Sequence, residues 1–452
     1  MRNTRVIQFV LGDVRNDARV RKSARKLRDA GYQITYVGYN KKPNPQKARF
    51  YQDEDLDDCP CHYINDGRRI YEPIVDFLNR QNPVREHDEK IKSSISRALR
   101  ESQHTLKDRV QALMLTPAYA LCLLGRQIHI DTYIDQFWGF QNRASRIGQD
   151  ILSLSPDIVH AHDLDAFALF APFARPANVK IIYDSHELET GRNAPRWTIE
   201  QRAAHAALEE RSIPLADRVI TVGPAICEIL SERYQIPLPT MVPNSPPKKN
   251  IRTNQRLAKR LGLQEDERVI LYLGGIMPNR GIEDLFQSLK ELPNQIHVAF
   301  IGYPVSVFES RFQSLLQEYS DYSSRIHVLG RKPYEDVVFE AYGADLGFNA
   351  IDLTCESYKN ALPNKFFEYV FADIPVLSTH QKDVVALTEK YELGGIIEDT
   401  SPKTLSKTIV KLLAKFPAGL SSLPRQRFIN EYCWENQSEK LLDLYQQLEA
   451  NL

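Results

Sequence analysis

Histidine and acidic side chains follow two predicted strands in the first half of the chain. His162 and Asp163 come after the β-rich run 157–160, and His186 and Glu187 follow the run 179–183 in the same way. Ligands of open α/β sheets bind at the carboxyl ends of parallel strands. A single histidine there is more often structural, but two neighbouring strand ends of this kind predict a polar ligand site.

A glycine-rich segment in the second half, residues 272–281, lies between a predicted strand and a predicted helix. Gly274 and Gly275 permit close approach of the backbone to a ligand, and Arg280 stands at the end of the segment. Amides at a helix N-terminus together with a guanidinium suit a diphosphate. A Gly-Gly pair after a strand also occurs in plain tight turns, so both readings stay open at this point.

The segment 361–369 places charged residues at the start of a predicted helix. Asn364 and Lys365 follow a proline, and Glu368 stands three residues after Lys365 on the same helical face. The lysine can neutralise a phosphate, and the carboxylate can accept both hydroxyls of a ribose. The alternative is a Lys/Glu pair on a solvated surface. Phe366 and its aromatic neighbours make the helix too apolar for that, so we expect its first turn to face a cleft.

Short β-rich runs separated by helix-length stretches surround these segments. The runs are 6–10, 33–37, 157–160, 179–183 and 218–222 in the first half, and 269–273, 297–301, 326–329, 346–349 and 375–378 in the second half. Parallel strands joined by crossover helices explain this spacing. The sequence therefore predicts an α/β protein with two Rossmann-like domains in tandem.

The domain boundary is predicted at residues 242–250, where prolines and like charges disfavour regular structure and suit a linker. The first domain then covers residues 1–246 and carries a predicted helical insertion at about 66–145, which interrupts the βα rhythm. Apolar residues recur at helical spacing within this insertion, between lysines and arginines. We favour packing of its apolar stripe on the domain, with peripheral contact to an anionic membrane surface as the second reading.

Composition excludes several classes of protein. Lys+Arg and Asp+Glu both total 58, so the overall charge gives no reason to expect nucleic acid as a partner. The six cysteines show no disulfide framework, and Cys59-Pro60-Cys61-His62 has no second Cys/His pair nearby to complete a metal site. The sequence shows no signal peptide and no apolar run long enough to span a bilayer. We therefore expect a cytoplasmic protein without a bound metal.

With these residues assembled, the chain resembles the retaining glycosyltransferases of GT-B fold called glycosyl transferases group 1, of the family 4 type. The resemblance spans nearly the full length. It rests on Asp17-x-Arg19, on the segments 157–163, 184–187, 274–281 and 330–334, and most specifically on 363–369 followed by 374–376. Residues 432–448 resemble the helix that crosses back onto the first domain in this fold.

The resemblance implies two domains that face each other across a cleft, with limits at 1–246, 247–425 for the donor domain, and 426–452 for the returning helix. It implies a nucleotide-sugar donor as co-substrate, no further cofactor, no obligatory metal, and a sugar or lipid-linked saccharide as acceptor. The implied catalytic residues are His162, Arg280 and Lys365. The implied donor-binding residues are Gly274, Gly275, Arg280, Asn360, Asn364, Lys365 and Glu368. The implied acceptor-binding residues are Asp17, Arg19, His186 and Glu187.

The implied reaction is sugar transfer with retention of the anomeric configuration, in which the acceptor hydroxyl attacks the face that the diphosphate leaves. Positive charge on the leaving group is then the main catalytic contribution. Surface polysaccharide or glycolipid assembly is the expected setting, at the cytoplasmic side and with peripheral contact to the inner face of the membrane as a hypothesis.

Two positions depart from the family pattern. Asn360 stands where the first glutamate of the Glu-x7-Glu motif is expected, and Gly275 stands where an arginine is frequent; Glu356 lies close enough in sequence to reach the sugar instead. A degenerate nucleotide-sugar-binding subunit, and an epimerase or hydrolase on the same fold, are therefore the alternatives. A dehydrogenase is disfavoured because the turn after the first strand, residues 11–15, lacks a Gly-x-Gly-x-x-Gly pattern.

Overall fold

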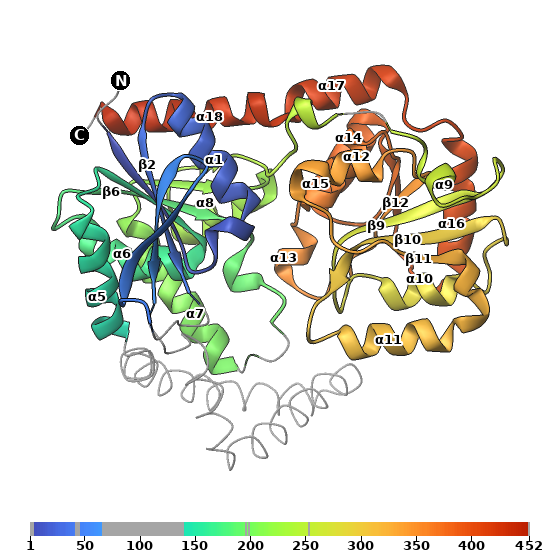
Figure 1. Ribbon diagram of the computed structural model, residues 1–452, viewed down its shortest axis with the longest axis horizontal. Coiled ribbons are helices and arrows are strands. Elements are labelled where there is room, and N and C mark those ends of the chain that lie inside the picture. The colour runs from blue at the N-terminus through green and yellow to red at the C-terminus, as the bar shows by residue number, and fades with distance from the viewer. Residues whose placement is uncertain are drawn as a thin grey trace, which may run out of the picture.

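Figure 1 shows the computed structural model, which describes residues 4–40, 46–65, 140–194, 197, 199–251 and 254–450. Two separate sheets form the protein, one in each half of the chain, and helices cover the faces of both. The prediction of two Rossmann-like domains is confirmed. The predicted insertion at 66–145 lies outside the described residues, apart from the start of helix α5.

The first sheet has eight strands in the order β3-β4-β2-β1-β5-β6-β7-β8. Neighbouring strands pair in parallel, except that β3 and β4 form an antiparallel hairpin at one edge. The sequence did not reveal this hairpin, because the exposed β3 strand carries a polar run instead of an apolar one. The strands are β1 (Arg5–Val10), β2 (Gln33–Tyr39), β3 (Phe50–Leu56), β4 (Cys59–Ile64), β5 (Ile158–His162), β6 (Lys180–Ser185), β7 (Arg218–Thr221) and β8 (Thr240–Met241).

The second sheet has six parallel strands in the order β11-β10-β9-β12-β13-β14. Its central strands are almost fully buried, as the apolar runs in the sequence predict for a sheet covered on both faces. The strands are β9 (Arg268–Ile276), β10 (Ile296–Pro304), β11 (Ile326–Val328), β12 (Leu346–Asn349), β13 (Val376–Thr379) and β14 (Gly394–Ile397).

Helices connect the strands in both domains. The first domain contains α1 (Ala18–Asp29), α5 (Phe140–Ser153), α6 (Asp163–Ala174), α7 (Ile199–Ser212) and α8 (Pro224–Tyr234). The second contains α9 (Leu257–Arg260), α10 (Ile282–Ser288), α11 (Glu309–Glu318), α12 (Val337–Ala341), α13 (Glu356–Lys359), α14 (Asn364–Phe371), α15 (Lys382–Tyr391) and α16 (Pro402–Lys415), followed by α17 (Ser422–Tyr432) and α18 (Trp434–Glu449). Short 3-10 turns are η1 (Val14–Asn16), η2 (Glu189–Gly191), η3 (Ile213–Leu215), η4 (Lys248–Asn250), η5 (Ser320–Arg325) and η6 (Tyr334–Asp336).

The C-terminal helix α18 returns to the first domain, as the red helix in Figure 1 shows. Its residues Leu441, Leu444, Tyr445 and Leu448 recur at helical spacing and are buried in the core beneath the first sheet. Tyr445 also contacts Tyr32 edge-on, with ring centroids 5.4 Å apart. The expected crossing helix is therefore present, and it ties the end of the chain to the N-terminal domain.

The segment between the sheets departs slightly from the prediction. Residues 242–247 have no helix or strand, as the prolines there predict, but Lys248–Asn250 form the 3-10 turn η4. The turn is fastened to α18, because the Glu435 carboxylate accepts from the Lys248 amide at 3.0 Å. The exact domain limits within this segment stay a prediction.

Cys59, Cys61 and His62 lie in strand β4. Alternation along the strand buries both thiols in one core, while the His62 ring packs on Phe50 with centroids 5.3 Å apart. The two thiols and the imidazole therefore face opposite sides of the strand and cannot ligate one ion together.

Direct contacts join the two domains beside the gap between their sheets. Arg233 of α8 pairs with Glu356 of α13 at 2.7 Å, and Glu228 of α8 pairs with Lys382 of α15 at 2.6 Å. The Asp383 carboxylate accepts from the Ala225 amide at the start of α8. Within the described part of the chain, no helix has both the length and the apolarity needed to cross a membrane.

Candidate functional site

A cavity of about 440 Å³ lies between the two domains, at the carboxyl ends of strands from both sheets. From the first domain it is lined by Asp163, His186, Glu187, Val222 and Ile226. From the second domain it is lined by the end of β9, by Arg280, by residues around α13, and by the start of α14 with Asn364, Lys365 and Glu368. We call it the donor cleft, because the residues predicted to hold the donor gather there.

Strand β9 runs through the glycine segment, so Gly274 and Gly275 belong to the strand and not to a turn. They pair with Gly302 and Tyr303 of β10. Gly274 has φ +99°, and a side chain built there would meet no atom within 4 Å. The bare backbone at this point lines the cleft, which leaves room for a ligand to approach it closely.

Helix α10 begins after Gly281, which has φ +66°. A side chain on Gly281 would come within 2.5 Å of the Ala350 carbonyl oxygen, so glycine is required by both conformation and space. This tight start of α10 places Arg280 beside the cleft.

Arg280 lies on an aromatic ring. Its guanidinium carbon is 4.7 Å from the centroid of Tyr358 in α13. Its buried Nε has no hydrogen-bond partner among the described residues. A buried guanidinium nitrogen without a partner is unusual, and a ligand oxygen would satisfy it.

Lys365 is arranged in the same way. The side chain is 9% exposed, and its Nζ lies 3.9 Å from the centroid of the Tyr272 ring in β9. Among the described residues, no carboxylate forms an ion pair with this ammonium. Burial, followed by the nearby charge of Arg280, lowers the pKa of Lys365 well below its usual value. Two basic side chains that form no ion pair with the described residues therefore line one cavity, an arrangement that a bound anion would stabilise.

Glu368 follows Lys365 by one helical turn and also lines the cleft. Burial raises the pKa of its carboxyl to about 7, against the opposing charges of Lys22 and Lys365. The side chain therefore titrates near neutral pH, and its carboxylate form is an acceptor for ligand hydroxyls.

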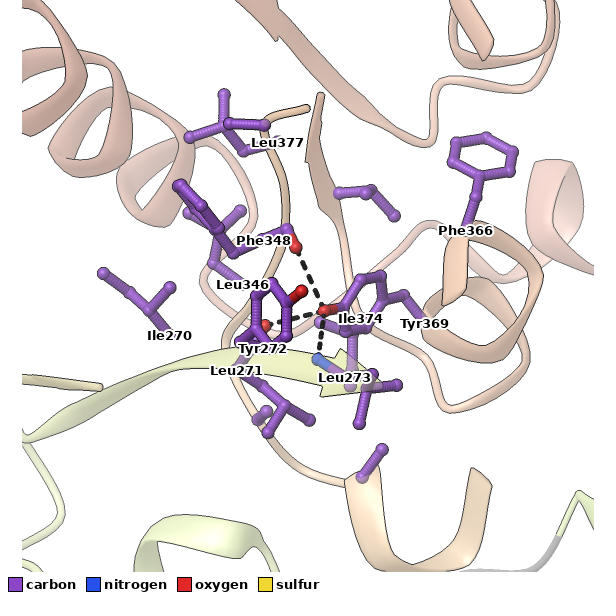
Figure 2. Close-up of a cluster of buried hydrophobic side chains, with 14 of the residues drawn as sticks. Ile270, Leu271, Tyr272, Leu273, Leu346, Phe348, Phe366, Tyr369, Ile374 and Leu377 are labelled. Atoms are coloured by element: carbon purple, nitrogen blue, oxygen red, sulfur yellow. Dashed lines mark hydrogen bonds between the residues drawn. The ribbon is translucent and has the colours of Figure 1, made fainter. Parts of the chain in front are cut away.

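Helix α14 is fixed to strand β9 by a buried hydroxyl, as Figure 2 shows. The Leu273 amide donates to the Tyr369 oxygen at 2.9 Å, and the hydroxyl lies 2.9 Å from the Leu271 carbonyl oxygen and 3.2 Å from that of Phe348. Tyr369 follows Glu368 directly, and Leu273 precedes Gly274. One hydroxyl thus sets the distance between two walls of the donor cleft.

His186 presents its ring to the cleft, with 20% of the side chain exposed. Its Nδ1 lies 3.4 Å from Asp163 and its Nε2 lies 3.6 Å from Asp184. Burial disfavours the charged ring, but the two carboxylates raise the pKa of His186 to about 9. At neutral pH the ring is therefore an imidazolium.

His162 is fully buried, and both of its ring nitrogens already have partners. Nε2 lies 2.8 Å from the Gln8 side-chain oxygen, and Nδ1 lies 3.1 Å from Nε2 of His186. Burial, then the neighbouring His160, lower the pKa of His162 to about 3, so the ring is neutral. A neutral ring that donates from Nε2 to Gln8 has a free electron pair on Nδ1, which accepts from His186. In this geometry His162 orients His186.

Arg19 and Asp17 bond to neighbouring parts of the first domain. The Arg19 guanidinium is buried and donates two hydrogen bonds to Asp184, at 2.7 and 2.9 Å, and a third to the Val242 carbonyl oxygen. Asp17 caps α1 by accepting from the amides of Arg19 and Val20. Neither residue lines the donor cleft, so their predicted role in acceptor binding stays a prediction.

The remaining predicted residues divide between the cleft and its margin. Asn364 is exposed at the first turn of α14 and lines the cleft. Glu187 also lines it, and accepts from the Ser357 hydroxyl across the domains at 3.2 Å. Asn360 does not line the cleft, and its amide donates to the Glu356 carbonyl oxygen at 2.9 Å. The Glu356 carboxylate in turn is paired with Arg233.

Several residues that shape the site escaped the sequence reasoning. The rings of Tyr358 and Tyr272 contact the side chains of Arg280 and Lys365. Nothing in the local sequence pattern distinguishes these two tyrosines from aromatic residues of the core. Lys22 is buried between the domains, where it donates to the Ser245 carbonyl oxygen at 2.8 Å and to the Tyr334 hydroxyl at 2.9 Å. The available indication was its position in α1, three residues after Arg19 and therefore on the same side of the helix.

One group in the described part of the chain has ligand atoms close enough for a metal: His160, His162 and Asp184. The Arg19 guanidinium is already hydrogen-bonded to both Asp184 oxygens, and its charge would oppose a cation. His160 is bonded to the Tyr445 hydroxyl at 3.0 Å and lies 3.3 Å from Asp184. These contacts fit a polar network that holds the strand ends and α18 in place.

Comparison with known proteins adds to this geometry. The family model described as Glycosyltransferase Family 4 matches residues 95–245, and the one described as Glycosyl transferases group 1 matches residues 253–421. A Bacillus subtilis (strain 168) relative, the candidate teichuronic acid biosynthesis glycosyltransferase TuaC, is 24% identical over 263 residues. That match covers 57% of this chain and 61% of the relative, so the chain spans less than two thirds of the curated relative's length.

Solved structures share the fold over the whole chain. Sucrose-phosphate synthase from Thermosynechococcus elongatus has a TM-score of 0.66 at 17% identity, with 100% of both chains covered. HepE from Anabaena, in complex with UDP and glucose, has a TM-score of 0.64 at 12% identity, with 98% of this chain and 100% of that chain covered. The chain therefore has the α/β GT-B fold, and its two halves are similar to Glycosyltransferase Family 4 and to Glycosyl transferases group 1.

Proposed function

We propose that the protein transfers a sugar from a nucleotide-sugar donor to a hydroxyl of a saccharide acceptor, with retention of the anomeric configuration. The observation that carries this proposal is the pair of cations in the donor cleft. Arg280 and Lys365 line one cavity, each rests on an aromatic ring, and neither forms an ion pair with the described residues. A diphosphate supplies the charge and the hydrogen-bond acceptors that this pair lacks.

Glu368 supports the nucleotide part of the proposal. Its carboxylate lies on the same helix as Lys365, one turn further on, and lines the same cavity. A carboxylate in this position can accept hydrogen bonds from both ribose hydroxyls while the diphosphate extends toward Lys365 and Arg280. The UDP complex of HepE supports UDP as the first nucleotide to test.

In the proposed reaction an acceptor oxygen forms a bond to the anomeric carbon as the bond from that carbon to the diphosphate oxygen breaks. Both events occur on the same face of the sugar, and the proton of the acceptor hydroxyl passes to the leaving diphosphate. Lys365 and Arg280 stabilise the negative charge that develops on the leaving group. His162 acts by orienting His186, whose ring meets the cleft. The chain supplies no covalent nucleophile, bound metal or further cofactor in this scheme.

The biological setting is part of the proposal. The relative named for teichuronic acid biosynthesis favours assembly of a surface polysaccharide, with a saccharide or lipid-linked saccharide as acceptor. Such assembly at the cytoplasmic side of a membrane would suit a peripheral contact by residues 66–145. Binding to anionic vesicles at low and high salt, with and without these residues, tests that contact.

A nucleotide-sugar-binding subunit without turnover is the second candidate. It is favoured by Asn360, which replaces the expected glutamate and whose amide is bonded to a backbone carbonyl instead of facing the cleft. Formation of a glycosylated product by the isolated chain would exclude this candidate.

The first experiment is a thermal-shift panel of UDP-, GDP-, ADP-, CMP- and dTDP-sugars. A ligand at about 100 times its dissociation constant adds about 2.7 kcal/mol to the free energy of unfolding. We expect one nucleotide to stabilise the wild type and the control Glu309→Ala, which changes an exposed glutamate on α11, but not Glu368→Ala. If no nucleotide sugar stabilises the wild type, the proposed function is wrong. The anomeric proton signals of donor and product then decide between retention and inversion.

A further inference from the structure

Three cavities form a row along the carboxyl edge of the first sheet. The donor cleft shares Asp163 and Met277 with a second cavity of about 510 Å³ at the ends of β1 and β5. The second cavity shares Val10 with a third cavity of about 660 Å³ at the ends of β1, β2 and β4. We call the second the middle cavity and the third the distal cavity. The shared residues make the three cavities direct neighbours.

The distal cavity has a wall of aromatic rings, formed by Tyr39, Tyr51 and Tyr63. Tyr51 and Tyr63 come from the two strands of the β3–β4 hairpin, and their rings stack with centroids 6.0 Å apart. Aromatic rings provide the apolar surface against which the C–H groups of a sugar pack. The hairpin that the sequence did not predict therefore contributes a large part of this wall.

A preorganised set of polar groups stands beside these rings. Arg15 donates to the Tyr63 hydroxyl at 3.0 Å and to Asp53 at 3.1 Å, and the Tyr63 hydroxyl donates to Asp13 at 2.7 Å. These contacts hold a guanidinium and two carboxylates in fixed positions around one opening. Donors and acceptors at fixed positions beside apolar surface are what recognition of a polyol requires.

The charges that line the distal cavity favour a neutral ligand over an anion. Asp13, Asp17 and Asp53 line it together with Arg15, which is already paired with Asp53, and the Lys47 ammonium lies 5.1 Å from the centroid of the Tyr51 ring. The three carboxylates still outnumber these two cations. A phosphate or diphosphate would be repelled by this excess of negative charge. The donor cleft has a different balance, because its three carboxylates, Asp163, Glu187 and Glu368, are accompanied by Arg280, Lys365 and the His186 ring.

We propose that the distal cavity binds a neutral saccharide unit of the acceptor. The unit that receives the new sugar then occupies the middle cavity, next to His162 and Asp163, and the preceding unit occupies the distal cavity. The acceptor is thus a saccharide of at least two units, and its diphosphate or lipid end, where it has one, lies beyond the distal cavity. This inference rests on the proposed function, because it assigns the acceptor of that reaction.

Gly12 offers a variant that closes the distal cavity without disturbing the fold. It lines the cavity, and a side chain built there would meet only Val10, at an ordinary contact distance of 3.9 Å. Gly12→Leu therefore adds volume in open space at the place where the ligand would lie. Glu54→Leu is the matched control, because Glu54 is exposed next to Asp53 on β3 and does not line the cavity.

The test uses the full chain saturated with UDP. Maltose, cellobiose, lactose, methyl α-glucoside and inorganic pyrophosphate are titrated into it separately, and saturation-transfer NMR measures the binding of each. We expect at least one disaccharide to bind the wild type and Glu54→Leu equally, and to bind Gly12→Leu at least about tenfold more weakly. The affinity for UDP should be the same in all three proteins, since the donor cleft is unchanged. Methyl α-glucoside should not distinguish them.

The inference is overturned if none of the disaccharides binds, if a disaccharide binds Gly12→Leu as well as the wild type, or if pyrophosphate binds and is lost in Arg15→Gln. Failure of the proposed function has a different signature, because none of the five nucleotide sugars of the thermal-shift panel would then bind the wild type. Loss of disaccharide binding in Gly12→Leu would still be measurable in that case without UDP.

Discussion

The ammonium of Lys365 lies 3.9 Å from the centroid of the Tyr272 ring, and this contact joins the start of α14 to strand β9. The ring supports a positive charge without neutralising it, as a carboxylate would. Arg280 on Tyr358 repeats the arrangement in the same cavity. The donor cleft therefore keeps two cations available for a ligand while it still packs their side chains.

Replacement of Lys365 by alanine should weaken binding of UDP about 10- to 100-fold. A hydrogen bond to a charged group contributes about 1.5–3 kcal/mol, and each 1.4 kcal/mol corresponds to about tenfold in affinity. Isothermal titration calorimetry measures the change. The control is Lys411→Ala, which removes an exposed lysine on α16 far from the cleft lining. Equal affinity in Lys365→Ala and wild type would show that Lys365 does not contact the diphosphate.

Removal of the Tyr369 hydroxyl should destabilise the second domain. In Tyr369→Phe the Leu273 amide loses its acceptor, and buried groups left without partners cost about 1–3 kcal/mol each. We expect the midpoint of urea unfolding to fall for the transition that reports the second domain. Tyr303→Phe is the control, because Tyr303 is 49% exposed in the same domain. An unchanged midpoint in Tyr369→Phe would mean that α14 does not depend on this hydroxyl.

His186 should titrate near pH 9 in the folded protein, and Asp163→Asn should lower that midpoint. Burial opposes the charged ring, and the carboxylates of Asp163 and Asp184 outweigh it. Since the folded pKa is raised above the unfolded value of about 6.5, the charged ring stabilises the fold fully below that value, and the stabilisation is lost as pH rises through about 9. Histidine ring protons observed by NMR report both effects.

His62 provides an internal control for that titration. Burial lowers its pKa, and it lies in strand β4, away from the donor cleft. Its midpoint should be the same in wild type and Asp163→Asn. A His186 midpoint below 6.5 in the wild type would contradict the electrostatic arrangement described above.

Binding of the nucleotide sugar should weaken as pH falls below about 7, and Glu368→Gln should remove this dependence. The carboxyl of Glu368 has its pKa raised to about 7 by burial, so it becomes protonated in this range and loses acceptor capacity for the ribose hydroxyls. The phosphates of a nucleotide sugar do not titrate near pH 7, so a pH dependence measured by calorimetry from pH 5.5 to 8 comes from the protein, and the comparison with Glu368→Gln assigns it to this carboxyl. A pH-independent affinity in the wild type would place the ribose elsewhere.

Local sequence patterns were sufficient for the two domains and pointed to part of the donor-cleft lining in the second one, without Tyr272 and Tyr358. Alternating β-rich runs and helix-length segments indicate parallel sheets, and the carboxyl ends of such sheets are where ligands bind. The aromatic neighbours of Lys365 and Glu368 already indicated that the start of α14 faces a cleft. The structure places Arg280, Lys365 and Glu368 around one cavity.

Other features depended on contacts between residues far apart in the chain. The β3–β4 hairpin forms because the polar strand β3 pairs with β4 at the edge of the sheet. The hydrophobic periodicity of the sequence does not reveal such a strand. His162 and Arg19 looked like ligand contacts, yet their nitrogens are bonded to Gln8, His186 and Asp184 on neighbouring elements.

The sequence by itself determined which segments become strands and helices, because side-chain periodicity and chain stiffness are local properties. It also determined that charged residues gather at strand ends. Only the tertiary structure decided which of these charges remain available to a ligand and which are neutralised by a partner. Lys365 contacts the ring of Tyr272, whereas Arg19 forms an ion pair with Asp184. The neighbour of each charged side chain is determined by how elements far apart in the chain pack together.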